Sequence, residues 1–283
     1  MKLITYDVHG EPTPGVVRNG RVLDLRGHLV RSILELLETP EAMERVRHAD
    51  TAFSGQGPAL DTLRLLPPVP GARKILCIGQ NYADHVAEQN KPLPERPILF
   101  AKFPTCLTGH DAPVVLPRGV TQLDYEAELV IVIGAKAKRV SKEKALDYVA
   151  GYTIGNDISA RDVQFRDVQW VRGKSYDTFA PTGPCLVTRD EIPDPHNLGI
   201  RCCVNGELRQ NSNTRNLVFD VPTLVSNLSE GITLEPGDLI FTGTPGGVGM
   251  WREPPVFLQP GYVVTAEIDG IGTLRNTIVA EED

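Results

Sequence analysis

The sequence predicts an α+β fold rich in β-structure, a mixed β-sandwich or roll with helices at its margin. Many short apolar runs are separated by Gly, Pro and Asn-Gly turn signals, as in sheets built from short strands. Helical periodicity is confined to a few segments. The strands also lack the regular alternation with helices that characterises Rossmann and TIM-barrel folds. With 283 residues, the chain is long enough for one large domain or two unequal ones.

Composition and charge exclude several classes of protein. The chain is 41% hydrophobic and 23% charged, which is ordinary for a globular protein. A net charge of -7 argues against a nucleic-acid surface. No stretch reaches the roughly 18 apolar residues of a membrane helix, and the first residues lack the apolar core of a signal peptide. The five cysteines follow no CxxC spacing, so we expect buried thiols in a reducing cytoplasm.

Residues 1–66 are expected to form a small α/β module. Residues 3–6 are strand-like, and residues 15–25 contain Asn19-Gly20, a pair that favours the positive φ angles of a type I′ hairpin turn. Two helical stretches follow, and the second begins at Pro40, a favoured first helical residue. Because the Pro-rich residues 66–71 predict an extended linker, we place a second, larger domain at residues 67–283.

The second domain opens with an apolar strand at residues 74–78, followed by a short polar segment. If that segment is helical, His85 and Glu88 lie on one face. A carboxylate beside an imidazole orients the ring and raises its basicity, which is how a general base is built. A surface His–Glu pair is the other reading. The Pro-rich residues 89–95 predict a mobile loop beside this pair, and the next strand ends at Lys102, which faces either a site or solvent.

Two glutamates precede a run of branched apolar residues at positions 129–133 that reads as a strand buried on both faces. Alternation along the strand puts Glu126 and Glu128 on the same face, with Cα atoms about 7 Å apart. Two carboxylates at a buried strand repel each other and lose hydration unless a positive charge lies between them. Hard divalent cations prefer carboxylate oxygens, and Asp157, at the end of a second apolar strand, could complete such a site. The alternative is a solvated strand start and a helix N-cap.

Potential substrate-binding side chains follow Asp157. Arg161 lies four residues further on and Gln164 three more, so on a helix the three residues share one face. Arg and Gln supply hydrogen-bond donors that could hold a carboxylate or a carbonyl. Asp162 and Arg166 in the same segment are read as an ion pair on the helix surface.

Loops contribute two further candidates. Residues 171–184 are rich in Gly, Pro and turn formers and predict an irregular loop, in which Lys174 could stabilise a developing oxyanion. The Gly-rich residues 243–249 lack the lysine of a P-loop, so we expect them to bring backbone and the Thr244 hydroxyl close to a ligand. The remaining segments predict hairpins at residues 200–211 and 262–279 and helices at residues 141–150 and 222–230, with Gly231 as the residue after the last of these helices.

Taken together and in order, seven motifs resemble the fumarylacetoacetate hydrolase superfamily, specifically its acylpyruvase-like branch of 2-oxo acid hydrolases and decarboxylases. The resemblance covers residues 70 to 280 or so, and its carriers are Gly79-Gln80-Asn81-Tyr82-Ala83-Asp84-His85, Asp124-Tyr125-Glu126-Ala127-Glu128-Leu129, Asn156-Asp157-Ile158-Ser159-Ala160-Arg161-Asp162, Gly173-Lys174-Ser175, Asn205-Gly206-Glu207, Gly237-Asp238 and Thr242-Gly243-Thr244-Pro245-Gly246-Gly247-Val248-Gly249. It implies a mixed β-sandwich roll as the catalytic domain, and a homodimer.

The resemblance also implies a role for each candidate residue. The positions that match the ligands of Mg²⁺ or Mn²⁺ are Glu126, Glu128 and Asp157. The positions that match a catalytic dyad on a lid helix are His85 and Glu88. The positions that match substrate-holding or oxyanion-stabilising groups are Arg161, Gln164, Lys174 and Thr244, and Lys102 is a further substrate-binding candidate.

These roles lead us to expect a metal-dependent hydrolase that cleaves the C–C bond of a 2,4-dioxo acid through a metal-stabilised pyruvate enolate. The alternatives are decarboxylation of oxaloacetate, keto–enol isomerisation, and isomerisation or hydration of a 2-oxo-enoic acid, because each uses the same electron sink. A binding module that keeps the fold without catalysis is the remaining class. We expect a small 2-oxo acid as the partner, no nucleic acid or membrane, and a cytoplasmic location.

Overall fold

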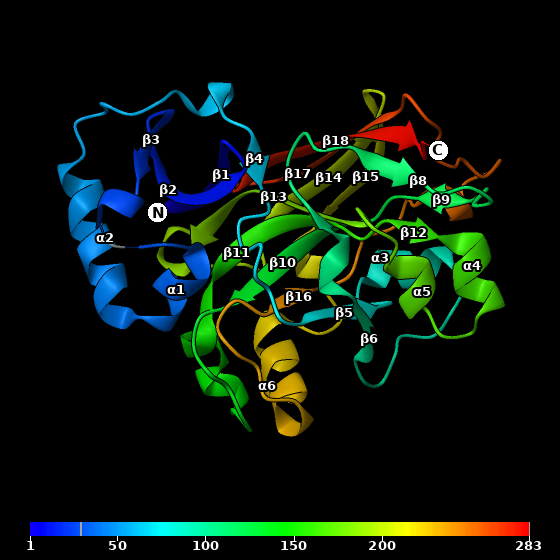
Figure 1. Ribbon diagram of the computed structural model, residues 1–283. Coiled ribbons are helices and arrows are strands. Elements are labelled where there is room, and N and C mark those ends of the chain that lie inside the picture. The colour runs from blue at the N-terminus through cyan, green and yellow to red at the C-terminus, as the bar shows by residue number, and fades with distance from the viewer. Residues whose placement is uncertain (29, 283) are drawn as a thin grey trace.

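The computed structural model describes residues 1–28 and 30–282, and a mixed sheet forms its centre (Figure 1). This sheet has 11 strands in the described part of the chain. Its main path runs through β3 (Arg21–Asp24), β2 (Glu11–Arg18), β1 (Lys2–Val8), β13 (Ala180–Thr188), β11 (Val149–Asn156), β10 (Ala127–Ile133), β16 (Leu239–Phe241), β5 (Ile75–Gly79) and β6 (Ile98–Lys102). Two short strands attach to it, β4 (Leu65–Leu66) on β1 and β7 (Leu107–Thr108) on β13.

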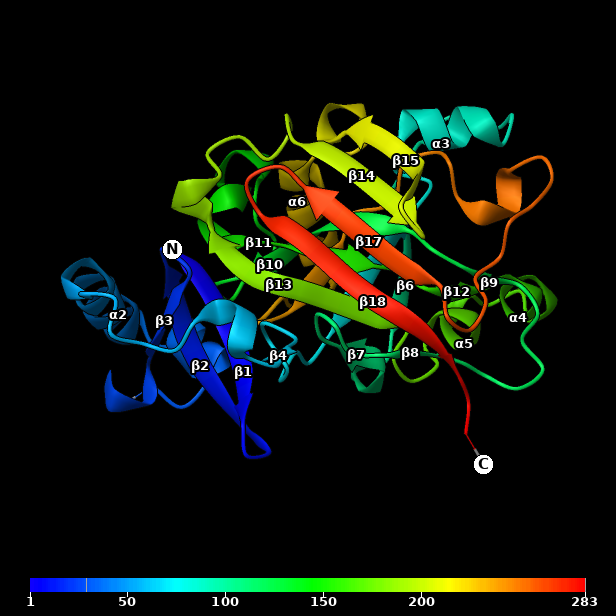
Figure 2. The same cartoon turned by 90° about the horizontal axis from the view of Figure 1, so that it is seen from above.

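A second sheet packs across the first, and Figure 2 shows its strands lying over β10, β11 and β13. Its order is β15 (Glu207–Asn213), β14 (Gly199–Val204), β17 (Val263–Ile268), β18 (Gly272–Ala280) and β8 (Val114–Leu116). A separate pair joins β9 (Leu123–Asp124) to β12 (Ser159–Ala160). The two packed sheets confirm the predicted β-rich sandwich.

Helices lie at the edges of the sheets (Figure 1). The α-helices are α1 (Ile33–Glu38), α2 (Pro40–Ala52), α3 (Ala83–Glu88), α4 (Arg161–Arg166), α5 (Val171–Lys174) and α6 (Val221–Gly231). The 3₁₀ helices are η1 (Arg26–His28), η2 (Leu60–Thr62), η3 (Pro104–Cys106), η4 (Lys142–Tyr148), η5 (Arg189–Glu191), η6 (Thr214–Asn216) and η7 (Gly249–Trp251). No helix in residues 1–28 and 30–282 has the length and apolar character needed to cross a membrane.

Strand β10, which contains Glu128, is the centre of the core. All seven residues of β10 are buried, and the strand pairs antiparallel with β11 on one side and β16 on the other. Burial on both faces explains why this strand is a continuous apolar run instead of an alternating pattern. The predicted hairpins are also present: Asn19 and Gly20 have φ angles of 51° and 72°, and Asn205 and Gly206 of 51° and 80°.

Three local expectations differ from the structure. Residues 171–184, expected to be an irregular loop, instead contain helix α5 and the first half of β13, whose hydrogen bonds to β11 override the Gly and Pro signals. The helix expected after residue 140 is the 3₁₀ helix η4. Gly231 is the last residue of α6 and not the residue after it.

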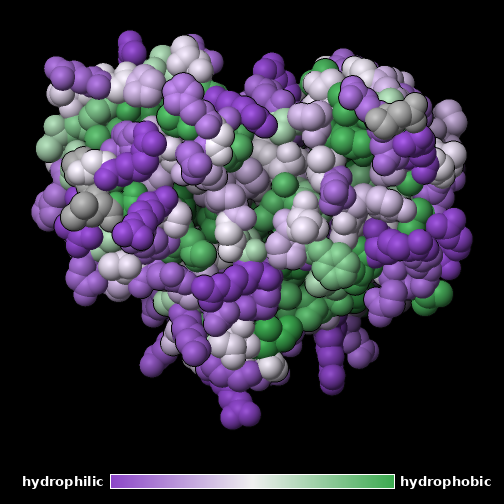
Figure 3. Space-filling model, in the orientation of Figure 1, coloured by the Kyte–Doolittle hydropathy of each residue, from purple (hydrophilic) through white to green (hydrophobic). Residues whose placement is uncertain are grey.

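The N-terminal residues join the main sheet. Strand β1 pairs antiparallel with β13, with Lys2 opposite Val187 and Leu3 opposite Leu186. β4, which ends at Leu66, pairs with β1 and closes the N-terminal segment on itself. A division of the chain at residue 66 therefore stays a prediction, because the backbone hydrogen bonds of the main sheet run across it. Figure 3 shows hydrophilic side chains over much of one face, with hydrophobic residues exposed in smaller groups between them.

Candidate active site

Three buried carboxylates meet where β10 begins and β11 ends. Glu126 precedes β10, Glu128 is its second residue, and Asp157 follows β11 directly. The antiparallel register brings the two strand ends together, and the Asp157 N–H donates to the Glu126 carbonyl at 2.9 Å. Each residue offers a carboxylate oxygen within 4.8 Å of those of the other two. Asp157, which lies 29 positions after Glu128, thus completes the expected three-carboxylate group.

Two buried lysines neutralise two of these acids. The Lys174 Nζ lies 2.9 Å from Glu126 Oε2 and 2.8 Å from Asp157 Oδ2. The Lys102 Nζ lies 2.5 Å from the other oxygen of Asp157. Glu128 accepts a hydrogen bond from the Gly243 N–H at 2.7 Å, and in the described part of the chain no lysine or arginine forms an ion pair with it.

A count of the buried formal charges shows that this cluster carries one negative charge in excess. Its four carboxylates are those of Asp124, Glu126, Glu128 and Asp157, and its three cations are those of Lys102, Arg161 and Lys174. Because an isolated buried charge is costly, a bound cation would stabilise the cluster. The all-oxygen donor set fits a hard divalent ion such as Mg²⁺ or Mn²⁺.

The local charges shift the pKa values of Glu126 and Glu128 in opposite directions. Burial raises the pKa of Glu126, but the charges of Lys174 and Arg161 outweigh burial and hold that pKa low, so the group is ionised. Burial and the nearby charges of Asp157 and Glu126 raise the pKa of Glu128 well above its usual value. Burial lowers the pKa of Lys174, but the negative charges of Asp157 and Glu126 outweigh burial and raise that pKa above its usual value. Lys174 is therefore a protonated ammonium group that donates hydrogen bonds.

Arg161 holds Glu126 in place. Its guanidinium lies 2.7 Å from Glu126 Oε1 and 2.9 Å from Asp124 Oδ2, and it donates to Gln164 at 3.1 Å. The carboxylate of Asp124 also accepts from the backbone N–H groups of Gly249 and Met250. Arg161 is the first residue of α4, so this network ties the start of that helix to the carboxylate cluster.

His85 and Glu88 form the expected dyad on α3. His85 Nδ1 lies 2.9 Å from Glu88 Oε2, and the other carboxylate oxygen accepts from the Gly247 N–H. His85 Nε2 lies 2.9 Å from the amide nitrogen of Gln89, whose carbonyl oxygen accepts from Lys91 and Gln80. An amide nitrogen can only donate, so this network places the proton of the imidazole on Nδ1 and leaves Nε2 with its lone pair.

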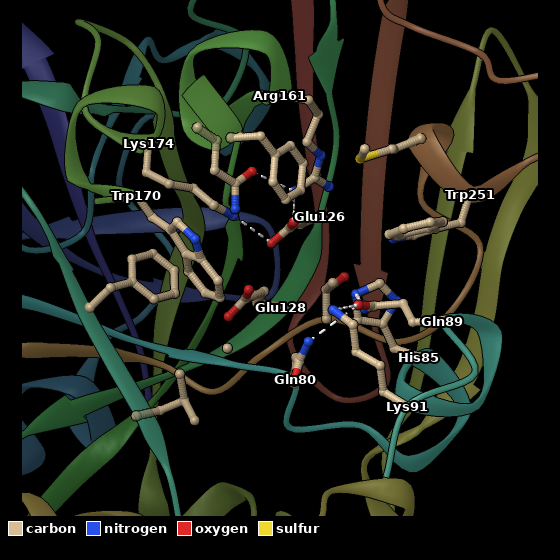
Figure 4. A pocket seen from close by; sticks show the side chains of 17 residues that line it. Gln80, His85, Gln89, Lys91, Glu126, Glu128, Arg161, Trp170, Lys174 and Trp251 are labelled. Atoms are coloured by element: carbon tan, nitrogen blue, oxygen red, sulfur yellow. Dashed lines mark hydrogen bonds and ion pairs between the residues drawn. The ribbon is translucent and has the colours of Figure 1, made fainter. Parts of the chain in front are cut away.

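The cluster and the dyad share one cavity. Figure 4 shows Lys174, Glu126 and Arg161 on one side of it and His85, Gln89 and Lys91 on the other. An aromatic wall completes it, in which the rings of Phe100 and Trp170 pack edge to face with centroids 5.4 Å apart. The side chains that line the cavity come from Ile78, Gln80, His85, Gln89, Lys91, Phe100, Glu126, Glu128, Arg161, Gln164, Phe165, Trp170, Lys174, Thr244, Met250 and Trp251.

The candidate residues from the sequence fall into two groups, those that line this cavity and those that do not. Its lining includes His85, Glu126, Glu128, Arg161, Gln164, Lys174 and Thr244. Asp157, Glu88 and Lys102 are not among the residues that line it. Lys102, expected among the substrate-binding groups, differs most from its expectation. Its side chain is fully buried, and it contacts Asp157 and the Ile158 carbonyl instead of the cavity. The Thr244 hydroxyl donates to the Ala127 carbonyl and accepts from Gln210.

Sequence reasoning missed several residues of the site. Asp124 stands at the head of the acidic motif, but no spacing rule assigns it a partner at Arg161. Gln89 and Lys91 fall in the segment that predicts a mobile loop, and both line the cavity. Trp170 carries no motif of its own. A cation or amide close after a catalytic histidine is the one local signal that could have identified Gln89 and Lys91.

Known proteins similar to this chain are consistent with this geometry. The family profile described as "Fumarylacetoacetate (FAA) hydrolase C-terminal" matches residues 74–279. The chain is 44% identical over 290 residues to the "Oxaloacetate tautomerase fahd2, mitochondrial" of Xenopus laevis, covering 99% of this chain and 90% of that protein. It is 45% identical over 255 residues to the "Oxaloacetate tautomerase FAHD2A, mitochondrial" of Homo sapiens, covering 89% of this chain and 81% of that protein.

Solved structures agree with these sequence matches. The fumarylacetoacetate hydrolase of Exiguobacterium antarcticum is 38% identical, with a TM-score of 0.83 over 99% of this chain and 100% of that chain. The maleylpyruvate hydrolase of Sphingobium sp. SYK-6, in complex with manganese(II) and pyruvate, is 30% identical, with a TM-score of 0.83 and full coverage of both chains. Fold, site and sequence therefore agree, and the chain belongs to the fumarylacetoacetate hydrolase family of enzymes.

Proposed function

We propose that this protein interconverts the keto and enol forms of oxaloacetate or a closely similar 2-oxo acid, with Mg²⁺ or Mn²⁺ as cofactor. The observation that carries the proposal is the cavity that joins a carboxylate cluster with an excess of negative formal charge to the His85 imidazole, whose Nε2 carries no proton and accepts a hydrogen bond from Gln89. The relatives that are named oxaloacetate tautomerases support this choice among the reactions that the sequence leaves open.

The residues of the cavity suit a proton transfer between carbon and oxygen. A divalent ion held by Glu126, Glu128 and Asp157 would supply Lewis-acid polarisation of the 2-oxo group. His85 Nε2 takes the proton from C3 of the keto form, and the electron pair of that C–H bond moves through C2 to the oxygen at C2. Glu88 holds the Nδ1 proton and stabilises the imidazolium that results.

Lys174 provides the charge that stabilises the oxygen at C2. Its ammonium has three N–H donors, and two of them contact Glu126 and Asp157. The third can donate to the substrate oxygen where negative charge develops, and the ammonium is itself buried, which strengthens such an interaction. The proton that His85 took from C3 then passes to that oxygen, which completes the enol and returns the imidazole to its neutral form, and the reverse sequence regenerates the ketone.

Hydrolysis of the C–C bond of a 2,4-dioxo acid is the second candidate. The same dyad that accepts a proton from carbon could accept one from water, and the water would attack the distal carbonyl. The maleylpyruvate hydrolase at 30% identity supports this reading. Both reactions place negative charge on the oxygen at C2, so they need the same carboxylates and the same lysine.

The two candidates are separated by a direct assay of both. The protein is loaded with Mg²⁺, supplied with freshly dissolved enol oxaloacetate, and followed by the decay of the ultraviolet absorbance of the enol. Acetylpyruvate and maleylpyruvate are assayed in parallel by release of pyruvate. We expect the protein to accelerate the decay of the enol over the uncatalysed rate, and a chelator to abolish this acceleration. We expect slow or no release of pyruvate. Cleavage of acetylpyruvate without any acceleration of enol decay would reverse the order of the two candidates.

A further inference from the structure

Lys91 is the unneutralised cation of the cavity. Arg161 and Lys174 also line it, but both form ion pairs with buried carboxylates. The Lys91 Nζ instead lies 2.8 Å from the neutral amide oxygen of Gln89, and among the described residues no acid forms an ion pair with it. An ammonium at the mouth of a cavity with only a neutral partner is available to a ligand carboxylate.

The backbone geometry of helix α3 fixes the position of Lys91. Asn90 adopts a left-handed conformation, with φ of 52°, directly after the helix. Its N–H donates to the Ala87 carbonyl at 3.0 Å, and the Lys91 N–H donates to the Val86 carbonyl at 3.2 Å. These two bonds form the pattern of a Schellman motif, which closes a helix in a defined geometry. The backbone of Lys91 is therefore held beside the dyad, although the sequence predicts a mobile loop for this segment.

Lys91 and the carboxylate cluster lie on opposite sides of the cavity. The carboxylate cluster and Lys174 lie on one side of the cavity, where the proposed reaction needs the 2-oxo acid end of the substrate (Figure 4). Lys91 lies on the other side, linked through Gln89 to His85. A substrate that presents C3 to His85 thus directs its far end toward Lys91.

We propose that Lys91 binds the second carboxylate of a dicarboxylic 2-oxo acid and thereby selects such substrates over those with a neutral far end. This inference rests on the proposed function, because that function places the 2-oxo acid end at the carboxylate cluster. The substrate carboxylate replaces Gln89 as the acceptor of the Lys91 ammonium. The competing feature is the aromatic wall of Phe100, Trp170 and Trp251, which would favour an aryl end.

The first test compares turnover of oxaloacetate with that of its 4-methyl ester, which keeps the 2-oxo acid and removes the distal charge. We expect Lys91→Met to lower kcat/KM for oxaloacetate about 10- to 100-fold, mainly through KM, because one charged hydrogen bond is lost. The value for the ester should stay unchanged. Lys91→Arg should retain the preference for the diacid, and Lys144→Met, at an exposed lysine outside the cavity, should alter neither substrate.

The second test measures binding without turnover. The Mg²⁺-loaded protein is titrated calorimetrically with 3,3-difluorooxaloacetate, which has no C3 proton to lose, and with its 4-methyl ester. If the wild type binds the diacid more tightly than the ester, and Lys91→Met loses this difference, the role of Lys91 is supported. That result holds even if no tautomerisation is found, and in that case the proposed function alone fails. The proposed role of Lys91 would be overturned if the wild type bound both ligands equally well or if the variant bound both more weakly by the same factor. A preference of the wild type for phenylpyruvate over oxaloacetate would overturn it as well.

Discussion

The residue whose environment is most informative is Glu128. It is buried and ionisable, yet its hydrogen-bond partner is a backbone N–H, whereas Glu126 and Asp157 each contact a lysine. A carboxylate in such a position destabilises the fold unless it is protonated or paired with a cation. This makes Glu128 the residue at which metal binding and stability can be measured separately.

We predict that Glu128→Gln abolishes metal binding and lowers turnover roughly 10³-fold or more, because several kcal/mol of Lewis-acid stabilisation are lost. The metal-free variant should melt at the same temperature as the metal-free wild type or higher, since a buried carboxyl whose charged form is disfavoured is replaced by a neutral amide. Calorimetric titration with Mn²⁺ and circular dichroism melting test the two effects. Normal turnover by the variant in the presence of a chelator would contradict the assignment.

A second prediction at the residue scale concerns His85. His85→Ala should lower tautomerisation and any hydrolysis of acylpyruvates about 10²- to 10⁴-fold, the usual contribution of a general base. Decarboxylation of oxaloacetate should be partly retained, because the loss of CO₂ needs neither a proton taken from carbon nor an activated water. Metal affinity should not change, as His85 contacts Glu88 and Gln89 and none of the three carboxylates. Equal loss of all three reactions would contradict this division.

At the scale of the elements, Asp124 joins three segments that are distant in sequence. It is the last residue of β9, it pairs with Arg161 at the start of α4, and it accepts from the backbone of Gly249 and Met250 in η7. Its carboxylate is fully buried. Removing one partner of a buried ion pair leaves the other charge unpaired in a medium of low polarity.

We therefore predict that Asp124→Ala lowers the free energy of unfolding by about 3 to 5 kcal/mol. Asp124→Asn should cost less, because its amide oxygen can still accept from one of the η7 backbone groups. Urea denaturation followed by tryptophan fluorescence measures both variants. Equal losses for Asp124→Ala and Asp124→Asn would show that the ion pair, and not the backbone contacts, carries the effect.

The docking of α2 onto η5 should depend on pH. The Arg47 guanidinium contacts Asp190 at 3.1 Å. Burial raises the pKa of Asp190, but hydrogen bonds from Arg47 and Thr188 outweigh it and lower that pKa from 3.8 to about 2. A carboxylate whose pKa is lower in the folded state contributes stability above its unfolded pKa and loses it on acidification.

The stabilisation by Asp190 should thus be complete above pH 3.8 and should disappear as the pH falls to about 2. Unfolding measured by urea across this range should show a steeper loss of stability in the wild type than in Arg47→Met. Both side chains are about half exposed, so we expect a small difference that decreases with added salt. Identical slopes for the two proteins would mean that the contact has no such role.

At the scale of the whole molecule, the main path of the large sheet ends at β3 on one edge and at β6 on the other. In the described residues β6 pairs only with β5, and Ile98, Leu99 and Phe103 beside this edge are exposed. An exposed edge with apolar side chains is a template for pairing with a second chain. The homodimer expected from the family resemblance would cover this edge.

We predict that the protein is a dimer in solution and that Leu99→Lys converts it to a folded monomer. A charge on an edge strand opposes pairing between chains. Leu208→Lys is the matched control, because Leu208 is similarly exposed on β15, the edge strand of the second sheet. Size-exclusion chromatography with light scattering measures the mass of each protein. A monomeric wild type, or a dimer disrupted only by Leu208→Lys, would contradict the prediction.

Much of the site could be predicted from the sequence because its signals are local. Glu126 and Glu128 are two residues apart at a strand, and His85 and Glu88 share one turn of a helix, so short-range geometry is enough to pair them. The relatives support one of the alternative reactions more directly than the expected hydrolysis. The expected cytoplasmic location stays a prediction, and the names of these relatives include the word mitochondrial.

By itself, the sequence determined the β-rich class and the hairpins, because periodicity and turn chemistry specify them, and its resemblance to a known family singled out the three acids and the dyad. Only the tertiary structure decided that Lys102 is buried behind Asp157, that β1 completes a sheet with β13, and that Lys91 faces the cavity without an acid beside it. The reason is physical. Such contacts depend on strand register and on the packing of segments far apart in the chain, which no local pattern specifies.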